Sequence, residues 1–182
     1  PVADFTGTPT SGVAPLNVSF ADASTGSVTS WLWAFGDGGT DTQQNPSHVY
    51  NTPGTYSVTL QVSGPGGSDA EVKLAYITVN DPPPVADFSG APQSGVVPLT
   101  VNFTNLTTGG PVSGWTWVFG DGTFSNLQTP SHTYTMTGTY TVTLIAAGPG
   151  GTDAETKTAY ITVSDPPPVA AFTGSPTSGV AP

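Results

Sequence analysis

Hydrophobic and polar residues alternate along several short stretches of the chain. Every second residue is apolar in 16–20 (LNVSF) and in 56–62 (YSVTLQV). A period of two is typical of β-strands with one buried face. The stretch 31–35 (WLWAF) places three aromatic rings on one face, and the glycines of 36–38 (GDG) favour a turn directly after it. With 77–79 (ITV) as a last strand, turn signals separate about seven strands in all.

The whole pattern occurs twice and begins a third time. Residues 1–5 (PVADF) return as 84–88 (PVADF) and as 168–172 (PVAAF), so the repeats begin 83 and 84 residues apart. Each copy is long enough to bury a core of its own. The sequence therefore predicts independent domains in a row.

These repeats divide the chain into three predicted segments. Residues 1–83 and 84–167 each form a sandwich, and 168–182 is the first-strand fragment of a third repeat. The triple prolines at 82–84 and 166–168 favour stiff polyproline II joints. Fifteen residues are too few for a sandwich, so we expect the natural array to continue beyond this chain. The alternative is that the fragment adds as a strand to a neighbouring molecule.

Composition strengthens the all-β prediction and excludes several functions. Charged residues make up 8% of the chain, and Lys and Arg total 2, too few to solvate the outer faces of amphipathic helices. The formal net charge of −10 disfavours binding to nucleic acid or to anionic membranes. No apolar run approaches the ~18 residues that span a bilayer, so membrane insertion is not expected. The absence of cysteine excludes disulfides and cysteine-based zinc sites.

Three motifs in the first copy resemble the signature of PKD (polycystic kidney disease) domains. They are 33–38 (WAFGDG), 46–50 (PSHVY) and 54–60 (GTYSVTL), and the same order recurs in the second copy. One departure is that the family often has Asp between the aromatic pair, where this chain has Ala34 and Val118. The resemblance implies all-β, tandem immunoglobulin-like sandwiches of about seven strands each. It also implies an extracellular or cell-surface module and supplies no active site.

Histidine is the first candidate for chemistry. His48 and His132 occupy the same position of the repeat, close to Tyr50 and Tyr134. No nucleophile motif accompanies them, and their repetition favours a structural hydrogen bond over general-base catalysis. We therefore expect that the chain is not an enzyme.

Calcium is the one candidate cofactor, because carboxylates supply the oxygen ligands that it needs. One candidate cluster lies at the aromatic turn and another near the domain junction. The alternative is that the turn aspartates bond their own backbone. The second copy keeps neither cluster complete. The two clusters consist of Asp37 and Asp41, and of Asp4, Asp22 and Asp81.

Other candidate sites lie on the surface. The alternation places Trp33 on the inward face of its strand, so it is expected in the core. Aromatics near loops could instead contact ligands, including sugar rings. The candidate surface contacts are Trp31, Trp115, Tyr76 and Tyr160. Three triplets fit the N-glycosylation sequon, and outward-facing Thr and Ser leave O-glycans as an alternative. The sequons begin at Asn17, Asn102 and Asn105.

These features favour a structural role. We expect an extracellular structural and adhesive repeat array, acting as a semi-rigid spacer or filament-forming segment of a cell-surface or secreted protein. Its partners would be other repeats of the same chain, neighbouring copies in a filament, or glycans. The alternative is a carbohydrate- or protein-binding accessory module of a secreted hydrolase.

Overall fold

The computed structural model describes residues 1–173, 175 and 179, and this part of the chain is built from strands and loops. The strands of the first repeat are β1 (Phe5–Thr8), β2 (Ser11–Val13), β3 (Leu16–Asp22), β4 (Ser30–Ala34), β5 (Thr40–Asp41), β6 (Ser47–Tyr50), β7 (Gly54–Gly64) and β8 (Gly67–Asn80). Those of the second are β9 (Pro84–Val85), β10 (Phe88–Ala91), β11 (Ser94–Val96), β12 (Leu99–Asn105), β13 (Thr108–Gly109), β14 (Gly114–Val118), β15 (Phe124–Ser125), β16 (Ser131–Tyr134), β17 (Gly138–Gly148) and β18 (Gly151–Ser164).

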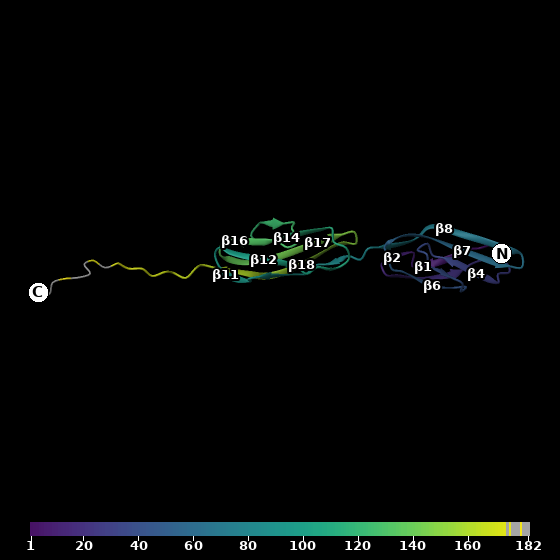
Figure 1. Cartoon of the computed structure of the whole chain (residues 1–182), viewed down its shortest axis with the longest axis horizontal. Helices are drawn as coiled ribbons and strands as arrows, with labels where there is room; N and C mark the ends of the chain where they lie inside the picture. Colours follow the sequence, from purple (N-terminus) through teal and green to yellow (C-terminus); the bar gives the residue numbers. More distant parts are fainter. Residues whose placement is uncertain (174, 176–178, 180–182) are drawn as a thin grey trace. The chain divides into compact units, whose positions relative to one another are not determined.

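Each repeat is a sandwich of two sheets (Figure 1). In the first repeat a sheet of order β1-β3-β6 faces a sheet of order β2-β8-β7-β4-β5. The second repeat has the same plan, with β10-β12-β16 and β11-β18-β17-β14-β15, and β9 pairs with β13. The predicted all-β fold of tandem sandwiches is confirmed. Among the described residues there is no helix that could span a membrane.

The first segment of each repeat contributes a strand to both sheets. β1 runs antiparallel to β3, with Phe5 opposite Asp22, whereas β2 runs parallel to β8, with Ser11 opposite Thr78. Pro9 lies between the two strands and has no N–H to donate, so it interrupts the ladder where the chain changes sheets. The split gives the first repeat eight strands where the sequence indicated about seven.

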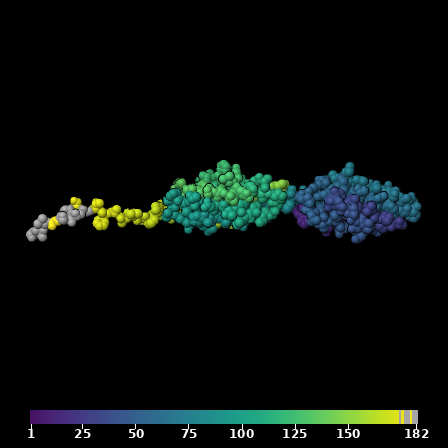
Figure 2. Space-filling view, in the orientation of Figure 1, coloured from purple at the N-terminus to yellow at the C-terminus, as the bar shows by residue number. Residues whose placement is uncertain are grey.

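Each repeat has a hydrophobic core of its own. The buried side chains of one cluster come from residues between Ala3 and Val79 in the sequence. Those of the second cluster come from residues between Phe88 and Val163. The alternation predicted for 16–20 is observed in β3, where the apolar side chains are buried and the polar ones exposed. The residues of each repeat form a compact body in the space-filling view (Figure 2).

The described chain divides into two compact units that differ slightly from the repeats. The first comprises Pro1–Val85, Thr107–Gly114 and Ala146–Asp153, and the second comprises Ala86–Leu106, Trp115–Ile145 and the chain from Ala154 onward. Two segments of the second repeat thus group with the proline linker, and in one of them Gly110 N donates to Pro83 O at 3.0 Å.

The predicted third-repeat fragment, 168–182, lies partly outside the described residues. Residues 168–173 form no strand, and Val169 and Phe172 are almost fully exposed. The equivalent residue to Phe172 in the first repeat, Phe5, is completely buried. Its burial there depends on side chains from the rest of the sandwich.

The turn after β4 needs glycine at one position more than at another. Gly36 has a φ of +88°, and a Cβ added there would overlap the backbone oxygen of Ser57 on β7. Gly38 has a similar φ of +95°, but a Cβ added there would meet no atom within 4 Å. Gly36 is therefore constrained by both conformation and space.

Gly36→Ala should destabilise the first repeat by about 3 kcal/mol or more, because left-handed strain of about 1–2 kcal/mol adds to the overlap with β7. Gly38→Ala, the matched control, should cost only the conformational strain of about 1–2 kcal/mol. Urea unfolding followed by tryptophan fluorescence measures both. Equal losses in the two variants would contradict this explanation.

Candidate functional site at the aromatic turn

A histidine and an aspartate pair at the turn of each repeat. Asp37 follows β4, and its Oδ2 lies 2.7 Å from Nε2 of His48 on β6. In the second repeat Asp121 and His132 meet at the same distance of 2.7 Å. The other carboxylate oxygen of Asp37 accepts a hydrogen bond from Gly39 N at 2.9 Å. The pair thus closes the turn, as expected for an aspartate that bonds its own backbone.

The histidine is one step of an aromatic ladder that runs from the core to the surface. The His48 ring stacks on Phe35 at 4.2 Å between centroids and meets Tyr50 edge to face at 4.7 Å. Tyr50 in turn packs on Tyr56 at 4.6 Å, and its hydroxyl donates to Phe35 O at 3.0 Å. The second repeat builds the same ladder from Phe119, His132, Tyr134 and Tyr140. Both histidines are therefore held by packing as well as by the carboxylate.

Electrostatics keep the turn carboxylates ionised. Partial burial alone would raise the pKa of Asp121, but hydrogen bonds from Thr123 and His132 outweigh it and hold the pKa below its usual range. The pKa of Asp37 is lowered in the same way against its partial burial, chiefly by His48 and Gly39. Burial, with a smaller effect of the nearby Asp121, raises the pKa of the Tyr134 hydroxyl. At neutral pH the ladder thus presents a negative carboxylate beside the neutral phenol of Tyr134.

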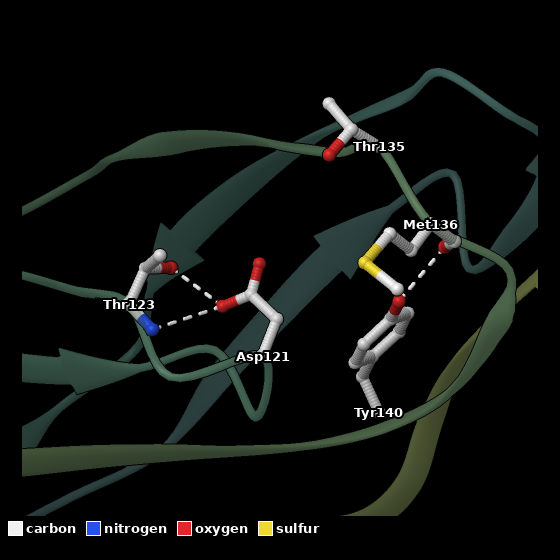
Figure 3. A pocket seen from close by; sticks show the side chains of 5 residues that line it. All are labelled: Asp121, Thr123, Thr135, Met136 and Tyr140. Atoms are coloured by element: carbon white, nitrogen blue, oxygen red, sulfur yellow. Dashed lines mark hydrogen bonds between the residues drawn. The ribbon is translucent and has the colours of Figure 1, made fainter.

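A small pocket opens beside the ladder in the second repeat. It has a volume of about 190 Å³ and is lined by Asp121, Thr123, Thr135, Met136 and Tyr140. Figure 3 shows Asp121 and Thr123 on one side, and Met136 and Tyr140 facing them on the other. The Tyr140 hydroxyl donates to Met136 O at 2.8 Å, which fixes the position of the ring. No pattern in the sequence indicated this pocket, although Met136 replaces Thr52 of the first repeat.

Asp4 and Asp22, candidates for calcium, make contacts inside their own repeat. Asp4 lies 3.0 Å from Lys73 Nζ, and this hydrogen bond is the main cause of its lowered pKa. The pKa of Asp22 is also lowered, because hydrogen bonds from Ser24, Gln44 and Trp31 outweigh its partial burial.

The remaining calcium candidates are Asp41 and Asp81. Asp41 accepts a hydrogen bond from Gln43 N at 2.8 Å, and Asp81 follows β8 and is half-buried. Within residues 1–173, 175 and 179, no three His, Cys, Asp or Glu side chains gather as metal ligands. Calcium also takes backbone and amide oxygens as ligands, so its binding at either cluster remains a prediction.

Lys73 was not identified from the sequence as a site residue. Besides Asp4, its ammonium group contacts the backbone oxygen of Phe5 and lies 4.7 Å from the centroid of the Phe5 ring. Lys157 makes the same contacts with Asp87 and Phe88. Lys73 therefore ties β8 to β1, and Lys157 ties β18 to β10.

The candidate contact aromatics are half-buried and pack against the cores. The Tyr76 hydroxyl accepts a hydrogen bond from Gly7 N, and that of Tyr160 accepts one from Gly90 N, both at 2.8 Å. The exposed part of each ring is what remains for outside contacts.

The two other contact candidates, Trp31 and Trp115, differ in the hydrogen bonding of the indole N–H. Trp31 Nε1 donates to Asp22 Oδ2 at 2.7 Å. Trp115 Nε1 is buried without a hydrogen-bond partner among the described residues, and Asn105 stands where the first repeat has Asp22. The second repeat thus lacks one hydrogen bond that the first repeat makes.

The sequon asparagines differ in accessibility. Asn17 on β3 and Asn102 on β12 are exposed, whereas Asn105 at the end of β12 is half-buried. Modification of these residues remains a prediction.

Asn105→Asp should stabilise the second repeat by about 1 kcal/mol or more, because a carboxylate would accept the orphaned Trp115 Nε1–H. NMR should show slower hydrogen exchange of the Trp115 indole N–H. Asp22→Asn is the matched control, and it should weaken the first repeat and speed exchange at Trp31. An unchanged Trp115 indole in Asn105→Asp would refute the assignment.

Parts of known proteins are similar to this chain in sequence. The chain is 38% identical to collagenase ColA of Bacillus cereus over 78 residues, which cover 41% of this chain and 8% of that protein. It is 37% identical to a microbial collagenase of Vibrio alginolyticus over 91 residues, 48% of this chain and 10% of the relative. The chain thus spans only a small part of the relatives that it matches.

One solved structure shares the fold over most of this chain. The amphioxus IgVJ-C2 molecule covers 83% of this chain and 99% of its own, with a TM-score of 0.53 and 17% identity. At that identity the likeness shows the immunoglobulin-like fold alone. The PKD domain family matches residues 1–79 and again residues 81–163. The chain therefore belongs to the PKD domain family and carries two of its domains in tandem.

Proposed function

We propose that the chain is an extracellular structural and adhesive segment that acts as a semi-rigid spacer, or as part of a filament, in a cell-surface or secreted protein. The observation that carries this proposal is the duplication of a self-contained unit. Both copies close their own core, and both use the same ladder and the same lysine contact inside the repeat. A domain whose polar side chains form their contacts within the domain can be repeated along a chain.

The linker supports the spacer role. Pro82 and Pro83 restrict the backbone where one repeat ends, and Gly110 N donates to Pro83 O. The match to two collagenases supports an extracellular location, because collagen is an extracellular substrate. The chain itself consists of PKD domains over both matched ranges, so any catalytic activity would belong to another part of a parent protein.

An accessory binding module is the second candidate function. It is favoured by the same two relatives, in which the matched segment occupies a small share of an enzyme. Such a module would hold carbohydrate or protein near a catalytic domain. Retention of this chain on insoluble polysaccharide or collagen, against a washed control matrix, would favour the accessory role over the spacer.

Replacing Pro82 and Pro83 together by Gly should loosen the joint between the repeats. The chain has no cysteine, so Leu74→Cys and Phe124→Cys place one spin label on an exposed position of each repeat. Electron–electron double resonance should give a narrow distance distribution that broadens in the glycine variant. Pro65→Gly, in the β7–β8 turn, is the control and should leave the distribution unchanged. A broad distribution in the parent chain would refute the semi-rigid spacer.

A further inference from the structure

We propose that the pocket of the second repeat binds the cationic end of a lysine or arginine side chain presented by a basic protein partner. This binding function goes beyond spacing and concerns the second repeat. It follows from the charge, the walls and the size of the pocket.

The carboxylate of Asp121 carries a charge that no lysine or arginine offsets. Its hydrogen-bond donors are the backbone N–H and the hydroxyl of Thr123, at 3.1 and 2.6 Å, and the imidazole of His132. The chain has only two Lys or Arg residues, and these bind Asp4 and Asp87. A cation in the pocket would therefore meet an ionised acceptor that is partly shielded from water, where ion pairing is stronger than on an open surface.

The opposite wall suits the same ligand. The Tyr140 ring and the Met136 thioether face Asp121 across the pocket (Figure 3). Tyr140 is held by its hydroxyl bond to Met136 O and by packing on Tyr134 at 4.4 Å, so the ring is already in place. An ammonium or guanidinium group is attracted to the face of an aromatic ring, and its methylene stem packs on apolar atoms. The pocket thus offers a cation both a carboxylate and an aromatic ring.

The size of the pocket fits one side-chain end. Its volume is about 190 Å³, and a cavity of about 150 Å³ accommodates a benzene-sized molecule. The butylammonium end of lysine has a similar number of heavy atoms. The formal net charge of −10 also attracts basic partners over longer distances.

The first repeat provides an internal comparison. It keeps the carboxylate, the histidine and the tyrosine of the site in Asp37, His48 and Tyr56. Its other wall positions differ, because Gly39, Asn51 and Thr52 replace Thr123, Thr135 and Met136. Without the thioether of Met136 and the hydroxyls of Thr123 and Thr135, the first repeat should bind the same cation more weakly.

An NMR titration of the isotope-labelled chain of residues 1–182 tests the proposal. The probes are N-acetyl-lysine-N-methylamide and its uncharged counterpart N-acetyl-norleucine-N-methylamide. The lysine probe should shift the resonances of Thr123, Met136 and Tyr140 at concentrations about tenfold lower than the norleucine probe. The corresponding arginine probe should shift the same resonances. Shifts at the Asp37 site of the first repeat should be smaller at every concentration.

Two variants separate binding from folding. Asp121→Asn should abolish the preference for the charged probe. The combined change of Thr123→Gly, Thr135→Asn and Met136→Thr keeps Asp121 and should reduce the response to that of the first repeat. Unchanged resonances of the core in each variant show that the repeat is folded. Equal shifts by both probes, a preference that persists in Asp121→Asn, or a stronger response in the first repeat would overturn the proposal.

Discussion

Burial of one tryptophan in each repeat is the constraint on which the sandwich depends. Trp33 is completely buried on β4, and its Nε1 donates to Gln43 O at 2.9 Å, so no polar atom of the indole is left unsatisfied. Phe5 on β1 meets the ring edge to face at 5.2 Å, and Phe20 on β3 lies at 5.5 Å. The indole thus joins the two sheets, and truncating such a ring costs about 3–5 kcal/mol. Trp117 repeats this arrangement in the second core.

The aromatic packing continues from this core to the surface and determines where variation is tolerated. The ladder fixes the histidine, the aspartate and the outer tyrosine in both repeats, so the turn has the same shape in each. Residues beside the ladder are free to differ, as at Met136, which is 73% exposed and replaces Thr52. A fixed scaffold with variable neighbours lets the surface of a repeated domain change without loss of its fold.

Alternation and repetition predicted the fold class, because a period of two directly reports one buried face. They also placed Trp33 in the core. The contact of Lys73 with Asp4 could not be predicted, since the residues lie 69 positions apart and meet only when the first and last strands close the sandwich. The sequence shows Asn105 at the position of Asp22. It does not show that Asp22 accepts a hydrogen bond from Trp31 or that Trp115 lacks such a bond, because both depend on the fold. The pocket likewise depends on the fold, which brings the turn after β14 beside the turn after β16.

Each repeat is stabilised by its own core. The decisive experiment is urea unfolding of the Trp33→Ala variant, followed by NMR signals from both repeats. Independent cores predict that the midpoint falls for Val58 and Leu60 of the first repeat, while Val142 and Leu144 of the second keep the midpoint of the unchanged chain. A matching fall in both repeats would contradict the claim.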